Sequence, residues 1–359
     1  MHAPATRGPV STELLAALGR NDFPDHLPTL ESAVDAALRA TEDILYDDDL
    51  QLALLCLYEL HYAGIEGVDD RWEWHPALVA VRSRIEAAFE DRLRRGIELA
   101  GIELAGIGRG DAGIEDRPIS SAQGVAEALF RMAEGGDGPS VSDFVARKAT
   151  LEQAREFLVH KSIYQLKEAD PHTWAIPRLP GRAKAAMVEI QADEYGGGRA
   201  GRMHSELFAR TMEGAGLEAA FGHYVDVLPA ITLASVNAMS LFGLQRRLRG
   251  AIVGHLAIYE MTSSLPNAKY ARGFRRLGFD SPVTDYFDEH VEADAVHEQI
   301  AGRDLAGGLV ESDPRLAADV FFGAAAVCLL DELVGAWQLG AWREGRSSLL
   351  AALPAPEAV

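Results

Sequence analysis

Three residues in the last quarter of the chain, His290, Asp294 and His297, have side chains that commonly bind metal ions. They are spaced by four and three residues, so on a helix they would project from the same face. Taken alone, such a triplet is more often a solvated or hydrogen-bonded face than a metal site. The spacing therefore predicts a metal site only if other helices supply further ligands.

A carboxylate on a second helix is a candidate for such a ligand. Glu194 follows Met187 and Ile190 by seven and four residues, so it prolongs an apolar stripe and should point inward. Glu189 and Asp193 fall on a different face of the same helix, and we expect both to be solvated. Glu194 is therefore the carboxylate of this helix that we assign to the interior.

Two further carboxylates continue apolar stripes in the same way. Glu260 lies seven residues after Val253, and Glu168 lies four residues after Tyr164. The helix that carries Glu168 should end near Asp170, because a proline comes next. Four predicted helices would each direct acidic or imidazole groups inward.

Buried carboxylates need compensation, because burying each without a partner costs several kcal/mol. The neighbouring stripes offer few lysines or arginines. Two divalent cations would neutralise the inward carboxylates, with imidazoles as neutral nitrogen ligands. Mixed carboxylate and imidazole ligation fits iron or manganese better than metals that prefer thiolates. The residues concerned are Glu168, Glu194, Glu260 and Asp294, with His204, His290 and His297.

The stretch between Glu194 and His204 must bend if both residues serve one site. On an unbroken helix they would lie about 15 Å apart along the axis and roughly 80° out of phase. Gly196, Gly197 and Gly198 are the obvious place for a kink, since glycine adopts backbone conformations closed to other residues. The alternative is an ordinary loop between two helices.

Apolar residues recur at helical spacing along most of the chain, and alternating strand patterns are scarce, so we predict an all-α fold. A glycine-rich, charged tract over 96–121 is expected to be a helix end that passes into a linker. Helices are predicted from Ser11 onward and over 30–45, 47–63, 76–99, 150–169, 181–195, 202–215, 228–263, 284–301 and 316–342.

The composition excludes some partners. The 359 residues carry a formal charge of −20, which disfavours nucleic acid and anionic membrane surfaces. Two cysteines in apolar runs and no apparent secretory signal favour the cytoplasm, and residues 1–10 are expected to be disordered. The uncharged segment 227–244 is interrupted by polar residues, so we interpret it as a buried helix and not a membrane span.

The chain resembles the haem-oxygenase-like diiron oxidases and oxygenases, also called iron-containing redox enzymes, over roughly residues 140–310. The resemblance is carried by Tyr164-Gln-Leu-Lys-Glu-Ala-Asp-Pro-His-Thr-Trp, Glu189-Ile-Gln-Ala-Asp-Glu-Tyr-Gly-Gly-Gly-Arg, Arg202-Met-His, Tyr259-Glu and His290-x3-Asp294-x2-His297. It implies a haem-oxygenase-like helix bundle over 131–350, an N-terminal helical extension over 1–130 that could dimerise, and a disordered tail over 351–359.

The resemblance also implies a cofactor and a reaction. Two irons would be held by Glu168, Glu194, His204, Glu260, His290, Asp294 and His297, with manganese as a possible surrogate. In this family a diferrous centre and O2 form a peroxo-diiron(III) species, which oxygenates nitrogen or abstracts hydrogen from carbon. The interval between Glu194 and His204 is similar to that of the N-oxygenase branch, so N-oxygenation of an amino acid or amine is expected. Amino-acid fragmentation and fatty-acid decarboxylation are the alternatives.

Five further residues could contact a small-molecule substrate: His172, Trp174, Arg178, Arg199 and Arg202. Arginine binds carboxylates through its bidentate fork. A helix-ending turn explains the first two residues equally well, and ordinary salt bridges would explain the arginines. No catalytic group beyond the ligands can be assigned. An external electron donor and a homodimer are expected partners. A haem protein, whose pocket would suit four carboxylates poorly, and a non-catalytic helical scaffold remain alternatives.

Overall fold

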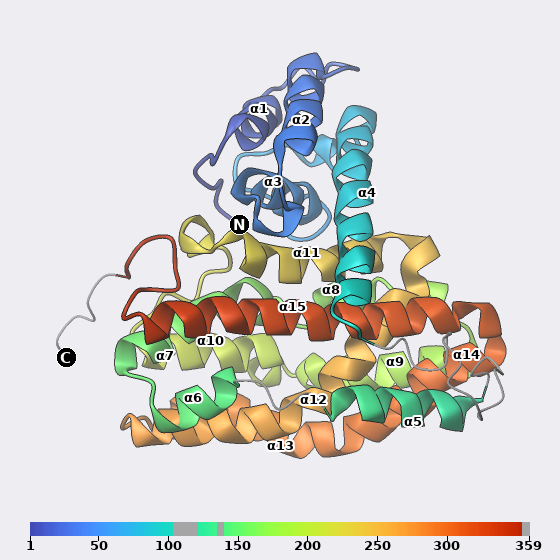
Figure 1. The fold of residues 1–359 in the computed structure, drawn as a ribbon, viewed down its shortest axis with the longest axis vertical. Helices are drawn as coiled ribbons and strands as arrows, with labels where there is room; N and C mark the ends of the chain where they lie inside the picture. Colours follow the sequence, from blue (N-terminus) through green and yellow to red (C-terminus); the bar gives the residue numbers. More distant parts are fainter. Residues whose placement is uncertain (103–120, 135–139, 354–359) are drawn as a thin grey trace.

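The computed structural model describes residues 1–102, 121–134 and 140–353, with the backbone but not the side chains of 292–296. Within these ranges every regular element is a helix and no strand occurs, which confirms the all-α prediction (Figure 1). Most of the predicted linker and of the predicted tail lies outside the described residues. The proposed division into an extension and a bundle stays a prediction.

Most predicted helices occur close to their predicted positions, and one coincides with its predicted range. The α-helices are α1 (Pro9–Leu18), α2 (Pro28–Ala40), α3 (Asp48–Glu59), α4 (Pro76–Leu99), α5 (Ala122–Ala133), α6 (Val141–Arg147), α7 (Leu151–Gln165), α8 (Asp170–Thr173), α9 (Gly181–Glu194), α10 (His204–Gly214), α11 (Ala230–Leu244), α12 (Arg249–Arg276), α13 (Ser281–Gln299), α14 (Gly308–Ser312) and α15 (Ala317–Arg343). A π-helical stretch, η8 (Ile300–Gly307), joins α13 to α14.

The longest helices form the centre of the bundle. Helix α12 packs along both α13 and α15, while α10 packs on α13 and α9 packs on η8. The first helices stack on one side of this bundle, with α3 against α11 and α4 against α15 (Figure 1). The predicted metal ligands lie on or directly next to α7, α9, α10, α12 and α13.

Helices α12 and α15 approach closely through two glycines. A β-carbon at Gly254 would collide with the carbonyl of Val320, and one at Gly323 would collide with the carbonyl of Ala251. Any side chain at either position would therefore force the two helix backbones apart. This contact fixes the wall of the bundle on which Glu260 lies.

The prediction of one continuous helix over 228–263 is wrong. Helix α11 ends at Leu244, Gln245 is extended, and α12 then runs from Arg249 past Pro266 to Arg276. The guanidinium of Arg178 donates to the carbonyls of Gly243 and Leu244, so a side chain distant in sequence satisfies the last carbonyls of α11.

The prediction that residues 1–10 are disordered is also wrong. The amino group of Met1 donates to the carbonyl of Gly64 at 3.0 Å, and Arg7 pairs with Asp48 at 3.1 Å. The carboxylate of Asp49 accepts hydrogen bonds from the backbone of Val10 at the start of α1. Polar contacts with residues far along the chain hold this segment, and its own composition gives no sign of them.

Most of the segment 227–244 forms helix α11, which begins at Ala230. Even Thr232, Asn237 and Ser240 are buried in it, as expected for an interior helix. Among the described residues, one helix, Pro314–Arg343, is long and apolar enough to cross a membrane by these criteria alone. Its apolar window is 56% buried within the protein, and it includes α15, which packs on α12.

Candidate metal centre

The three glycines after Glu194 break the helix, as predicted. Helix α9 ends at Glu194, and Gly196, Gly197 and Gly198 have φ of 65°, 60° and 78°. Two short turns follow, and α10 begins at His204. At Gly196 the chain also passes so close to the next turn that a β-carbon would lie 2.6 Å from the backbone carbonyl carbon of Arg202. Glycine is therefore required at position 196 for two reasons, the positive φ and the close approach of the backbone.

The break brings His204 back to Glu194. The imidazole Nδ1 of His204 lies 2.9 Å from Oε2 of Glu194, and the residues are 2% and 7% exposed. A straight helix could not have placed these atoms in contact.

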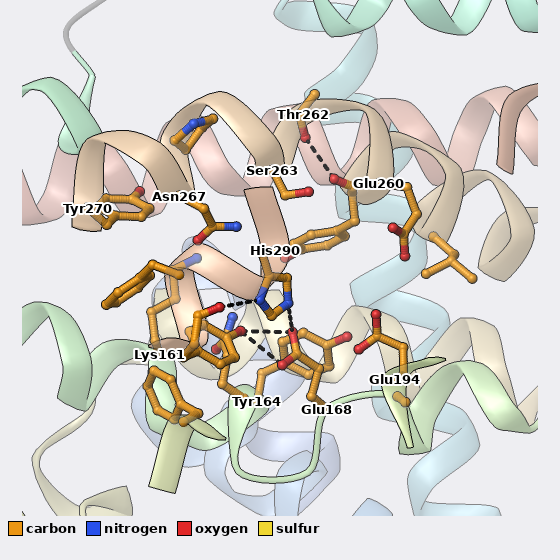
Figure 2. A pocket seen from close by; sticks show the side chains of 18 of the residues that line it. Lys161, Tyr164, Glu168, Glu194, Glu260, Thr262, Ser263, Asn267, Tyr270 and His290 are labelled. Carbon is orange, nitrogen blue, oxygen red and sulfur yellow. Dashed lines mark hydrogen bonds and ion pairs between the residues drawn. The ribbon is translucent and has the colours of Figure 1, made fainter. Parts of the chain in front are cut away.

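Six of the seven predicted ligands lie in two groups. In each group, one potential ligand atom per residue lies within 4.8 Å of all the others. Glu168, Glu194, His204 and His290 form the first group, and Glu194, Glu260 and His297 form the second. Figure 2 shows the carboxylates of Glu194 and Glu260 converging on one end of the cavity. The side chain of Asp294, the seventh predicted ligand, lies outside the described residues.

Helix α13 presents His290 with a defined tautomer. Its Nδ1 lies 2.7 Å from the carbonyl of Tyr286, which can only accept, so Nδ1 carries the proton. The other nitrogen, Nε2, lies 3.6 Å from Oε1 of Glu168. Its lone pair is therefore available to a metal ion that Glu168 also binds. The hydroxyl of Tyr286 donates to both oxygens of Glu168, at 3.0 and 2.9 Å. Tyr286 therefore orients both residues.

Glu168 does not lie on a helix, contrary to the prediction of a helix over 150–169. Helix α7 ends at Gln165, and residues 166–169 form a turn in which Ala169 has a φ of 78°. This conformation is unfavourable for a residue with a β-carbon. Pro171 then lies in the first turn of α8, where its missing N–H costs nothing. The strained turn aims Glu168 at His290.

The potential ligand atoms are placed to bind a metal ion and not to form hydrogen bonds with one another. Oε2 of Glu194, Nδ1 of His204 and Nδ1 of His297 are all buried without a partner of hydrogen-bond geometry. Buried polar atoms are rarely left in this state, because each costs about 1–3 kcal/mol. Atoms that lie close together and aim at a common point are the arrangement that a bound cation requires. The carboxylate and imidazole set suits iron.

Without a metal, protons supply the balancing charge. Burial alone would raise the pKa of Glu194, but the imidazoles of His204, His290 and His297 outweigh it and lower that pKa to about 2. Burial alone would lower the pKa of His297, but Glu260, Asp193 and Glu194 raise it to about 9. At neutral pH the metal-free site therefore holds a carboxylate at Glu194 and an imidazolium at His297.

Metal binding should accordingly depend on pH. A metal ion bound at Nδ1 of His297 must displace the proton, so the apparent affinity should rise about tenfold per pH unit below about pH 9. Competitive titration with Mn(II) at about pH 6.5 and about pH 8 measures the change in apparent affinity. A pH-indicator dye measures the number of protons that are released on binding. An affinity that stays constant over this interval would exclude His297 as a ligand.

Asp193 was predicted to be solvated, and its role is only partly captured by that prediction. Its side chain is 62% exposed, yet its Oδ2 lies 3.0 Å from Nε2 of His297. The opposite nitrogen, Nδ1, lies 3.2 Å from Oε2 of Glu260. A carboxylate behind a histidine ligand fixes the tautomer that turns the other nitrogen toward the metal. Helical periodicity could not reveal this contact, because it depends on where α13 lies.

Replacing Asp193 by asparagine should weaken metal binding without unfolding the protein. Loss of such an outer carboxylate typically costs 10- to 100-fold in metal affinity, and we expect about tenfold here. Mn(II) titration of Asp193→Asn measures it. Glu189→Gln, an exposed change on the same helix, is the matched control and should leave affinity unchanged.

The predicted substrate contacts are only partly near the site. His172 lines the cavity next to the ligands and lies 3.0 Å from His255. Trp174 packs edge-on against Tyr62 and does not line the cavity. The three arginines also lie away from the cavity: Arg178 binds the carbonyls at the end of α11, Arg199 is exposed, and Arg202 pairs with Glu289 on the surface.

A cavity of about 140 Å³ adjoins both ligand groups. Its walls come chiefly from α7 and α12, with α13 and α15 closing the sides. Glu168, Glu194, Glu260 and His290 line one end of it. A small molecule in the cavity would therefore reach the candidate metal centre directly.

Comparison with known proteins agrees with this geometry. Residues 155–332, a range that includes all seven candidate ligands, match the family of iron-containing redox enzymes. The nitrosourea synthase of Streptomyces achromogenes subsp. streptozoticus is 26% identical over 298 residues, which cover 80% of this chain and 59% of that protein. The chain thus spans about six-tenths of the length of the curated relative that it matches. The family match and the helical architecture confirm the predicted haem-oxygenase-like fold.

Proposed function

We propose that this chain, a member of the iron-containing redox enzymes, is a non-haem diiron oxygenase that oxidises a small polar metabolite. One observation carries the proposal: Glu194 belongs to both ligand groups, as expected of a carboxylate that lies between two metal ions. Glu168, His204 and His290 would hold one ion, and Glu260 and His297 the other. Manganese would serve as a surrogate, and an external donor would supply electrons.

The bound irons would supply the electrons that activate O2, and the chain's own residues would control where this happens. Tyr286 keeps Glu168 oriented through its hydroxyl proton, which both carboxylate oxygens share, while Asp193 keeps the Nδ1 of His297 facing inward. Burial of His204 and Glu194 keeps bulk water away from their ligand atoms. These contacts favour a preformed site that needs little rearrangement when metal binds.

N-oxygenation of an amine or amino acid is the reaction that we favour. The name of the similar nitrosourea synthase refers to nitrogen chemistry, and the cavity is lined by many polar groups. Carbon–carbon cleavage of an amino acid remains the competing outcome of the test. Fatty-acid decarboxylation is a second competing reaction, and the acyl compounds in the test panel address it.

The test is anaerobic loading with Fe(II), followed by O2 and a panel of amines, amino acids and acyl compounds. We expect about two iron equivalents per chain and a product that carries one oxygen atom from labelled O2 on nitrogen. Product lacking a carbon fragment would instead indicate cleavage. Full activity without bound iron would overturn the proposal.

Two non-diiron alternatives give different results in simple measurements. Haem binding would produce a Soret band on titration. A non-catalytic scaffold would show no change in Tm with Fe(II) or Mn(II), since a ligand that binds only the native state must stabilise it. We also propose a cytoplasmic homodimer, which light scattering after gel filtration would test.

A further inference from the structure

The turn that carries Glu168 is held by a buried ion pair with a helix that supplies no metal ligand. Lys167, the residue before Glu168, donates a hydrogen bond to Oε1 of Glu59, the last residue of α3. The side chains of Lys167 and Glu59 are only 6% and 1% exposed. Glu59 lies outside residues 155–332, which match the family, so the ion pair joins the N-terminal helices to the candidate metal centre.

Aromatic rings also fix the ammonium of Lys167. Its Nζ lies 4.2 Å from the ring centroid of Tyr62 and 4.8 Å from that of Phe221, within the range of cation–π contacts. The hydroxyl of Tyr62 lies 3.0 Å from Oγ of Ser240 on α11, which holds the first ring in place. The end of the Lys167 side chain therefore has a defined position.

The turn needs such contacts because it is strained. Ala169 has a φ of 78°, a conformation that persists only where the surrounding structure imposes it. On one side of Glu168, Lys167 is bound to α3. On the other side, Asp170 accepts a hydrogen bond of 2.7 Å from the hydroxyl of Tyr195, the residue after α9. Glu168 thus lies between two residues that are each held by another helix or its end.

Glu59 also neutralises a positive charge beside a site for cations. Without Glu59, the buried ammonium of Lys167 would lose its counter-ion, and an uncompensated buried charge is strongly unfavourable. Glu168 and Asp170 are the carboxylates of the same turn, and a bond from Lys167 to either would rearrange that turn. An ammonium bound to Glu168 would compete directly with a metal ion for its carboxylate.

We propose that Glu59 is a positioning residue for the candidate metal ligand Glu168, and that it acts by holding Lys167. Helix α3 is then part of the structure that supports the metal centre, although it supplies no ligand. The holding of the turn follows from the contacts of Lys167, whereas its effect on metal binding rests on the proposed function.

The variant Glu59→Gln tests the proposal, because it removes the charge at nearly constant size. In the turn, the N–H groups of Lys167 and Asp170 donate to the carbonyls of Tyr164 and Lys167 at 2.8 and 3.2 Å. Hydrogen exchange of the metal-free, full-length protein, followed by mass spectrometry, should be at least about tenfold faster over 166–170. In a Mn(II) titration, one of the two equivalents should bind about tenfold more weakly and the other as in wild type.

A second buried ion pair in the N-terminal helices provides the matched control. Oε1 of Glu86 lies 3.3 Å from Nε of Arg82, and these side chains are 3% and 7% exposed. Glu86→Gln should lower Tm, as Glu59→Gln does, but should leave exchange over 166–170 and both Mn(II) affinities unchanged.

The double variant Glu59→Gln/Lys167→Met separates positioning from stability. Replacing both charges leaves no unpaired buried ion, so Tm should recover toward the wild-type value. Fast exchange over 166–170 and the weakened Mn(II) equivalent should both remain, because the bond that holds the turn is still absent. If Glu59→Gln does not fold, this variant gives the same comparison with wild type.

Three results would overturn the proposal: unchanged exchange over 166–170 in Glu59→Gln, equal weakening of both Mn(II) equivalents in Glu59→Gln and Glu86→Gln, or recovery of Mn(II) affinity together with Tm in the double variant. Failure of the proposed function looks different. Fast exchange in Glu59→Gln, with no Mn(II) binding by the wild type, would leave the held turn standing and defeat the diiron proposal. Wild-type exchange and metal binding in Glu59→Gln, with iron-dependent oxidation intact, would do the reverse.

Discussion

Replacing Glu194 by alanine should abolish the binding of both metal ions, and with it all iron-dependent activity. Glu194 belongs to both ligand groups, so its loss removes a ligand from each ion at once. Metal affinity should fall by more than about 100-fold at each site, since a directly bound carboxylate contributes more than an outer one. Anaerobic Fe(II) titration with metal analysis of the desalted protein measures the stoichiometry.

Single-site variants give the matched comparison. His204→Ala should weaken binding of the ion in the group of Glu168, His204 and His290 and leave binding of the other ion unchanged. His297→Ala should weaken binding only of the ion in the group of Glu260 and His297. Glu189→Ala, on the exposed face of the same helix, should retain full metal content. If Glu194→Ala still bound two equivalents with wild-type affinity, the shared-carboxylate arrangement would be wrong.

Replacing Gly196 by alanine should destroy the same site by moving backbone, although no ligand is changed. The new β-carbon would lie 2.6 Å from backbone atoms of Arg202 and Met203, and the residue would be held at a φ of 65°. We expect a loss of about 3 kcal/mol or more of folding free energy, together with loss of the His204 contact. Denaturant unfolding and Mn(II) titration measure the two effects.

Gly197 provides the control for this substitution. It has a φ of 60°, but a β-carbon there would meet no atom within 4 Å. Gly197→Ala should therefore cost only the left-handed conformation, about 1–2 kcal/mol, and should keep both metal ions. Equal effects of the two substitutions would mean that the close approach at Gly196 is not what positions His204.

The features that could be predicted from the sequence are those with a local cause. Glu194 could be distinguished from Glu189 by its place on an apolar stripe, and the buried position of Glu194 bears this out. The kink followed from comparing the rise of a helix with the needs of one site. Whether these residues bind metal stays a prediction, because no comparison tests it residue by residue.

Features that depend on distant contacts could not be predicted. The turn at Glu168 requires a positive φ at Ala169, a conformation that alanine's own preference argues against. Asp193 meets His297 only because α9 and α13 are neighbours in space. Likewise, α11 ends where Arg178 reaches its last carbonyls. In each case, tertiary contacts override or add to what the local sequence favours.

The glycine contact between α12 and α15 has a consequence for how a ligand enters. Gly254 and Gly323 leave no space between the two backbones, so these helices cannot slide past one another without a collision. Glu260, which lines the cavity from α12, is therefore carried by a rigid frame. Any widening that admits a ligand must come from the opposite walls, where α7 ends in a strained turn and α13 passes into a π-helix. Entry and release should thus be governed by the mobility of these two segments.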